Sequence, residues 1–309
     1  MRTRRARCPA LAVARVAIAV ATLCGILALP APAHARRDTG LGPRDTALLA
    51  PRGTLSIGLF APLTYTPRAD VELAVHPLVF AMAPHLGVKV RHLRAGDLTL
   101  TGDYGLSLPS VALRNELPLG LRGYLTPACK VTDHDPALAD SCQLPGWILV
   151  GRAGVLATLA TGARAAPRRT LTLGADLAVG ALLAGDRGHA LGAWPWLELL
   201  LAPAVDGWRA RVGAAWDEAP GPRWLRVRAA VDTFLAARRA DDDRSPITLR
   251  AELGGDLRLS RSARVALSLY YWNSDTRAQA IVEGDDGHPD RVFVRSHDLL
   301  PWADLIWAF

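Results

Sequence analysis

The sequence predicts an all-β fold: an antiparallel up-and-down transmembrane β-barrel of about twelve strands, within a range of roughly 10 to 14. Three observations lead to this class. Apolar and polar residues alternate along most of the chain after residue 53, several alternating segments are longer than strands of soluble domains, and tryptophans gather near the segment ends. The chain has 309 residues, of which 50% are apolar, so composition alone allows one or two domains of several classes.

The first 35 residues have the features of a secretory signal peptide. Four arginines between positions 2 and 7 precede an apolar run over 16–29, and Ala33-His34-Ala35 follows as a small-residue cleavage site. A membrane-spanning helix needs about 20 apolar residues, so this run is too short to serve as an anchor. We expect cleavage after Ala35, then a periplasmic N-terminal linker over 36–52 and a single barrel domain over 53–309.

Charge and cysteine usage both depend on this leader. Five of the 36 basic residues lie in it with no acidic residue, so the remainder is nearly balanced against 29 acidic residues, and nucleic acid is not an expected partner. Cys8 and Cys24 leave with the leader. We expect Cys129 and Cys142 to form a disulfide in an oxidising compartment, worth about 3 kcal/mol. Their spacing does not fit a zinc site, and we expect no metal or other cofactor.

The segment 247–260, ITLRAELGGDLRLS, carries the clearest alternation. Its odd positions hold Ile, Leu, Ala, Leu, Gly, Leu and Leu, and its even positions from 248 to 258 hold Thr, Arg, Glu, Gly, Asp and Arg. A helix would scatter the four charges around its circumference, whereas a strand separates one apolar face from one charged face. The same template predicts twelve strands in chain order: 54–61, 70–76, 86–91, 98–107, 147–159, 170–179, 192–202, 208–217, 225–232, 247–260, 263–273 and 302–309.

Strand length separates a membrane barrel from a soluble sandwich. Sandwich strands are mostly 5–6 residues long, whereas a transmembrane strand needs about 9–11 residues. Thirteen residues tilted by roughly 40° rise about 33 Å, enough to cross an apolar band about 25 Å tall. Tryptophans support the barrel, because aromatic girdles mark both membrane interfaces. The residues concerned are Trp147, Trp194, Trp196, Trp208, Trp216, Trp224 and Trp272. Ordinary core tryptophans are the alternative interpretation.

The chain ends on Leu305-x-Trp307-x-Phe309, an apolar alternation closed by an aromatic residue. Together with the signal peptide and the long strands, this ending resembles Gram-negative outer-membrane β-barrels as a class. The resemblance implies a location in the cell outer membrane and an assembly signal formed by Leu305, Trp307 and Phe309. It also implies outer-membrane lipid, lipopolysaccharide, periplasmic chaperones and the barrel-assembly machinery as partners, and leaves the oligomeric state open.

One feature conflicts with this arrangement. Seven predicted strands separate the two longest predicted loops, 109–146 and 274–291, so the loops would leave opposite sides of the membrane. Barrels of this class keep their long loops on the outer side. Either one strand is wrongly predicted, with 192–202 the weakest, or the cysteine loop faces the periplasm.

The polar face of each strand should line the lumen. The residues expected there are Arg209, Arg211, Arg226, Arg228, Arg250, Glu252, Asp256 and Arg258, together with Lys89, Arg91, Glu72, Asp103, Asp176 and Asp232. An arginine ladder of this kind favours anions, so we expect a porin-like passive channel for small, anionic solutes. The alternatives are a structural or adhesive protein whose lumen is plugged by ion pairs, a barrel-type lipid-modifying enzyme, and a soluble periplasmic sandwich.

Catalytic and metal-binding motifs find little support. Ser296-His297-Asp298 has the residue types of a hydrolase triad, but neighbours in a strand point to opposite faces. The acidic stretches 241–243 and 283–290 miss the spacing of a calcium loop, and His76 before Pro77 is typical of a turn. The sequence-based expectation is that the protein is not an enzyme.

Overall fold

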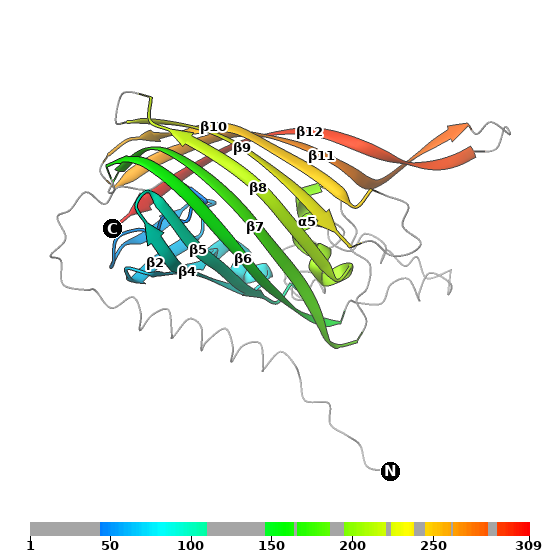
Figure 1. Cartoon of the computed structure of the whole chain (residues 1–309). Helices are drawn as coiled ribbons and strands as arrows, with labels where there is room; N and C mark the ends of the chain where they lie inside the picture. Colours follow the sequence, from blue (N-terminus) through cyan, green and yellow to red (C-terminus); the bar gives the residue numbers. More distant parts are fainter. Residues whose placement is uncertain are drawn as a thin grey trace, which may run out of the picture. The chain divides into compact units, whose positions relative to one another are not determined.

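The computed structural model describes residues 44–109, 146–163, 166–185, 195–220, 224–237, 245–260, 262–283 and 289–309. These residues form twelve strands and two short helices (Figure 1). The elements in chain order are β1 (Leu55–Gly58), β2 (Leu63–Arg68), β3 (Val71–Val75), α2 (Pro77–Met82), β4 (His85–Ala95), β5 (Leu98–Ser107), β6 (Trp147–Ala163), β7 (Ala166–Ala184), α5 (Pro195–Val205), β8 (Trp208–Glu218), β9 (Leu225–Ala236), β10 (Ile247–Arg258), β11 (Ala263–Glu283) and β12 (Pro289–Ala308).

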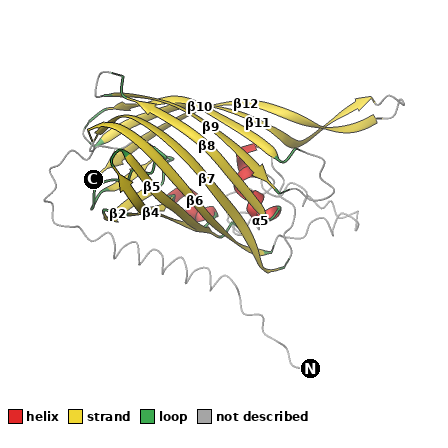
Figure 2. Cartoon of the chain, viewed as in Figure 1, coloured by secondary structure: helices red, strands yellow, loops and turns green. Residues whose placement is uncertain are grey.

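The strands form one closed antiparallel barrel. Every strand pairs with its neighbours in sequence, and β1 pairs with β12 to close the sheet. Figure 2 shows strands making up almost the whole wall, with the helices as the only other regular elements drawn. The predicted fold class and strand number are therefore confirmed. A two-sheet sandwich is excluded, because all twelve strands belong to one ring.

The wall is apolar outside and polar inside. Large aliphatic side chains are among the most exposed, including Val212 and Leu253, with 65% and 66% of their surface accessible. Polar residues on the opposite face are buried, such as Glu252 next to Leu253, and Asp232 next to the exposed Val231. The sheet thus inverts the polarity of a soluble domain, as expected where hydrocarbon is the outer solvent and the enclosed lumen is polar. No helix among the described residues is long and apolar enough to cross a membrane.

The segment 192–202 was wrongly predicted as a strand. Residues 195–205 form the helix α5, which starts at Pro195, where the missing N–H and fixed φ of proline suit the first helical turn. Its run of leucines has no clear period, so periodicity could not separate helix from strand. The missing strand is β2 (LTYTPR), which lies between the predicted strands 54–61 and 70–76 and was not predicted. It contains Pro67 and pairs irregularly with β3.

With β2 counted as a strand and 192–202 removed, the two long connections no longer fall on opposite sides of the membrane. Because the strands alternate in direction, Ser107 and Trp147, which flank the cysteine loop, lie at the same end of the barrel as Glu283 and Pro289. The long connections therefore leave one end, and the short turns and the C-terminus lie at the other. Cys129 and Cys142 themselves lie outside the described residues.

Strand lengths differ strongly around the barrel. β1, β2 and β3 have four to six residues, whereas β11 and β12 have 21 and 20. The predicted loop 274–291 is wrong over most of its length, since β11 continues to Glu283 and β12 starts at Pro289, with a register shift between Asp275 and Gln279. Beyond Asn273, β11 pairs with β12 alone.

The tryptophan prediction holds only in part. Trp208, Trp216 and Trp224 are exposed on the outside, as a girdle requires. Trp272 is buried and stacks on Phe234, with ring centroids 6.1 Å apart. It belongs to the inner face, because it lies opposite Arg250 across the β10–β11 ladder. The structure does not describe the side chains of Trp194 and Trp196, so their prediction stays untested.

The seam between β1 and β12 closes the barrel with few contacts. Only Ser56, Ile57 and Gly58 are in register with β12. Phe309 extends the seam, because its N–H donates to the Leu55 carbonyl at 2.8 Å and its carbonyl accepts from the Leu55 N–H at 3.1 Å. The last residue therefore contributes two of the closing hydrogen bonds.

Deleting Phe309 should lower the yield of assembled barrel severalfold, because the seam loses both hydrogen bonds. Phe309→Ala keeps the backbone and removes only the aromatic ring, so it isolates the expected assembly signal. The fraction of heat-modifiable protein in outer-membrane extracts measures assembly. Normal assembly of both variants would contradict both the closing role of the Phe309 backbone and the signalling role of its ring.

Candidate functional site

The structure brings most of the predicted lumen residues together inside the barrel. Arg209 and Arg211 from β8, Arg228 from β9, and Arg250, Glu252 and Asp256 from β10 all contact oppositely charged partners there. Arg226 donates to the Pro167 carbonyl at 2.9 Å. Arg258 differs, because it lies at the β10 end and its Nε donates to the Ser260 carbonyl at 3.0 Å.

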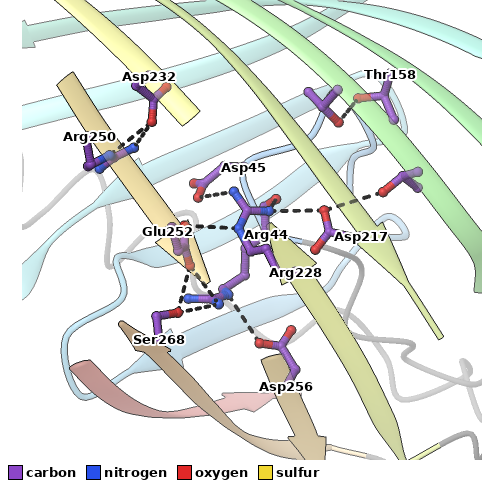
Figure 3. A network of polar contacts seen from close by, with 12 residues as sticks. Arg44, Asp45, Thr158, Asp217, Arg228, Asp232, Arg250, Glu252, Asp256 and Ser268 are labelled. Atoms are coloured by element: carbon purple, nitrogen blue, oxygen red, sulfur yellow. Dashed lines mark hydrogen bonds and ion pairs between the residues drawn. The ribbon is translucent and has the colours of Figure 1, made fainter. Parts of the chain in front are cut away.

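A central cluster forms around Arg228, which is 5% exposed. Its Nε donates to Glu252 at 3.1 Å, and one terminal nitrogen donates to Asp217 at 3.1 Å. Figure 3 shows these contacts converging on the guanidinium from β8 and β10 and from the segment that precedes β1. Ser268 of β11 donates to Glu252 at 2.7 Å. The cluster therefore cross-links β8, β9, β10 and β11 through the lumen.

The segment 44–50 lies in the lumen and completes this cluster. The Arg44 side chain contacts Glu252 at 3.3 Å and Asp256 at 3.2 Å, and the Arg44 carbonyl accepts from Arg228 at 3.0 Å. Further along, the Ala47 N–H donates to the Thr158 hydroxyl at 2.8 Å. The Ala47 carbonyl accepts from Thr101 at 2.7 Å. This segment thus bridges β9 and β10 to β5 and β6.

Asp45 occupies an unusual backbone position at the centre of the cluster. Its φ of 52° is in the left-handed region, which aspartate tolerates better than most residues. The turn lets Arg44 and Asp45 face different wall residues, with the Asp45 carboxylate 3.4 Å from Arg228. The Asp45 side chain keeps 74% of its surface accessible, facing the enclosed lumen.

The surrounding charges shift the pKa values of both segment residues. Enclosure by the protein raises the pKa of Asp45, but Arg228, Lys89 and Arg44 outweigh this effect and lower it well below its usual range. Burial lowers the pKa of Arg44, but the carboxylates of Asp256 and Glu252 outweigh the burial and raise it. Both groups are therefore held in their charged forms.

A second cluster, here called the outer cluster, consists of Arg209, Arg211, Arg250, Asp176 and Asp232. It lies nearer the end from which the long connections leave. Arg250 donates to Asp232 at 3.0 Å through its Nε, and Arg211 pairs with Asp176. Arg209 lies 3.6 Å from Asp176. Three arginines face two aspartates, so this cluster has an excess of one positive charge.

Aromatic rings surround the outer cluster. The Arg250 guanidinium lies 5.7 Å from the ring centroid of Phe234 and 5.6 Å from those of Tyr270 and Trp272. Arg209 lies 5.6 Å from the centroid of Phe234. Cation–π attraction therefore adds to the ion pairs in holding these guanidinium groups in place.

The helix α5 packs inside the barrel next to the outer cluster. Leu201, Ala204 and Val205 pack with Ile148 and Val150 on the inner face of the wall. Leu199 packs with Phe234 and Trp272, and its carbonyl accepts from Arg209 at 2.9 Å. Close packing at β7 depends on Gly180, because a Cβ there would meet the Pro203 carbonyl oxygen at 2.0 Å. The helix thereby narrows the lumen.

Other candidate groups do not form a recognisable centre. Among the described residues, no group of three or more His, Cys, Asp or Glu side chains is arranged to hold a metal ion. His297 contacts the Tyr271 hydroxyl at 2.7 Å and Asn273 at 3.1 Å, rather than taking the part of a base in a triad. His76 caps α2 by accepting from the Val79 N–H at 3.4 Å, consistent with its predicted place at a turn.

No family model matches the chain, and no curated protein matches its sequence. Solved structures do match at about 10% identity. OmpT of Vibrio cholerae matches over 80% of this chain and 64% of its own, with 10% identity and a TM-score of 0.43. LpxR from Salmonella typhimurium matches over 83% and 88%, with 11% identity and a TM-score of 0.38. A FadL homologue of Pseudomonas aeruginosa matches over 82% and 67%, with 10% identity and a TM-score of 0.35.

The closed barrel, its apolar exterior and its charged interior define the protein as an outer-membrane β-barrel at the level of class. The chain spans 64% of the length of the OmpT chain that it matches. The matches identify no subfamily.

The sequence-based expectation excluded an enzymatic function, and this exclusion is wrong. It was based on the lack of a local catalytic motif, and the matches to the outer-membrane proteins OmpT and LpxR overturn it. The physical reason is that a barrel assembles a site from separate strands, so such a site leaves no short motif in the sequence. At these identities the matches assign no reaction to this chain.

Replacing Arg228 by alanine should destabilise the barrel by about 3–5 kcal/mol, because Asp217 and Glu252 would remain buried without their cation. Arg169→Ala is the matched control. Arg169 pairs with Glu218 at 2.6 Å but is 62% exposed, so its loss should cost less than about 1 kcal/mol. Urea unfolding in lipid vesicles measures both values, and equal costs would contradict a buried central cluster.

The pH dependence of stability should reflect Asp45. Its pKa is lowered in the folded state, so its contribution is fully present above the unfolded value of about 3.9 and is lost as pH falls through the lower folded value. The difference in thermal midpoint between the wild type and Asp45→Asn should therefore stay constant from pH 8 to about pH 5. A difference that shrinks within that window would contradict the assignment.

Proposed function

We propose that the protein is a gated outer-membrane pore for small polar solutes, closed in this conformation by the segment 44–50 and narrowed by α5. One observation carries the proposal. The centre of the lumen is occupied by residues that do not belong to the wall, and polar contacts to Thr101, Thr158 and Arg228 hold them there. Water can replace such contacts, so the segment can leave while the wall stays intact.

The wall itself supports a polar path. Buried threonines line its inner face on β5, β6 and β7, and charged residues line β8 to β10. Eight strands enclose a lumen that side chains fill, whereas sixteen or more leave a wide channel. Twelve strands fall between these limits, so removal of one bound segment can decide whether solute passes.

The outer cluster supports a preference for anions. The outer cluster keeps an excess of one positive charge beside the rings of Phe234, Tyr270 and Trp272. A solute arriving from the end of the long connections meets this cluster before the central one. Rings of arginine select anionic solutes by the same electrostatics.

A non-conducting structural protein with a plugged lumen is the second candidate. It is favoured by the close ion pairs of the central cluster, which cross-link four strands. The two candidates differ in whether removal of the segment opens a path for ions.

Removing residues 44–50 should raise single-channel conductance in planar lipid bilayers severalfold, because the central lumen becomes free. A variant lacking residues 36–43 keeps the segment and is the matched control. In the opened variant, chloride should permeate better than potassium, and Arg250→Gln should weaken that preference. A shortened variant that is correctly folded but does not conduct would favour the plugged structural protein.

A further inference from the structure

The wall is incomplete on one side of β12. This strand has 20 residues, yet β1 is in register only with residues 306–308. The next contacts are the Leu59 N–H to the Leu305 carbonyl, and the Phe60 N–H to the Asp304 carboxylate, both at 3.0 Å. Beyond these, the described residues give the β1 side of β12 no backbone partner.

The direction of the free backbone groups follows from the seam. The Leu305 carbonyl and the Phe309 N–H point to β1, whereas the Ala308 N–H bonds to the Ser262 carbonyl next to β11. Because backbone groups alternate along a strand, odd residues of β12 direct theirs away from β11. Among the described residues, the amides left without a partner on this side therefore include those of Leu299 and Ala303.

Position 301 agrees with this geometry. Pro301 has an odd number, so its nitrogen, which carries no hydrogen, faces the unpaired side. Proline within a sheet is confined to places where no ladder hydrogen bond is needed, chiefly edge strands. The sequence thus marks β12 as an edge strand above the seam, although the barrel is closed below it.

An unpaired edge cannot face hydrocarbon, since each unsatisfied backbone group there costs several kcal/mol. Irregular or unpaired backbone at membrane depth is tolerated where it lines water or protein. The strands that face this edge of β12 are short, because β1 to β3 have only four to six residues. Phe60 reaches across to Trp302, with ring centroids 4.9 Å apart. No described residue supplies a backbone partner to this edge above the contact, which leaves water to line it among the described residues.

An apolar groove adjoins this edge on the outer face. It has a volume of about 590 Å³ and crosses the sheet from β9 to β12, where its lining ends at Pro301 and Ala303. Leu253, Leu267 and Leu269 line its walls and are exposed. Gly255 leaves room at its base, and a Cβ there would meet the Arg226 carbonyl oxygen at 2.5 Å.

We propose that the barrel has a lateral opening between β12 and the short strands β1 to β3, and that the groove beside it seats one acyl chain of a membrane lipid. The groove lies in the apolar belt, so membrane lipid is the molecule in contact with it, and its volume is in the range of ligand sites. With its chain there, the lipid can place its polar head at the opening. This inference does not depend on the segment 44–50 or on ion conduction.

Hydrogen exchange at residue resolution, measured by NMR on the full chain in lipid nanodiscs, tests the opening. The amides of Leu299 and Ala303 should exchange at least tenfold faster than those of Leu300 and Trp302, which bond to β11. Equal protection of the four amides would show that the edge is covered, and would overturn the opening.

Native mass spectrometry with phosphatidylethanolamine tests the groove. Ala303→Phe should fill the groove and reduce the retained lipid severalfold. Ala153→Phe is the matched control, since Ala153 is also an exposed alanine on the outer face and does not line the groove. Heat-modifiable mobility confirms that both variants are folded. Equal retention by the two variants, at any level, would overturn the lipid site.

Discussion

The structure depends on one constraint: a chain surrounded by hydrocarbon has to satisfy its backbone hydrogen bonds within itself. A sheet does so only when its first and last strands pair, which here is achieved by a seam a few residues long at β1 and β12. Closing the sheet then separates two solvents. Leucine and valine side chains on the outside meet lipid, and the alternate side chains face an enclosed polar space.

Charge in that space has to be paired, because the enclosure lowers the local dielectric constant. The central cluster meets this requirement with residues from several strands and with Arg44 and Asp45 from outside the wall. The outer cluster adds aromatic rings and the helix α5. The same requirement therefore accounts for a stable interior and for a segment that is bound by replaceable contacts.

Period-two alternation was enough to predict the fold class, since segments such as 247–260 leave no helical interpretation. It failed where the local pattern is ambiguous: the leucine-rich α5 has no clear period, and Pro67 concealed β2. The lumen-facing side of Arg228, Arg250 and Glu252 was predictable from register. Arg44 was not, because it meets Glu252 208 positions away and no local pattern reports such a contact. Trp272 was misplaced because its strand was predicted to end at residue 273, whereas β11 continues to Glu283, and because register places Trp272 on the inner face opposite Arg250.

The central claim is that hydrocarbon, and not protein, covers the outer face of the sheet. Spin labels placed one at a time at positions 249 to 257, in a background without cysteine, measure this with an apolar and a polar relaxation agent in lipid vesicles. The account predicts that oxygen accessibility is high at every odd position and low at every even one. Uniformly low oxygen accessibility at the odd positions would show that protein or water covers that face, and would contradict the account.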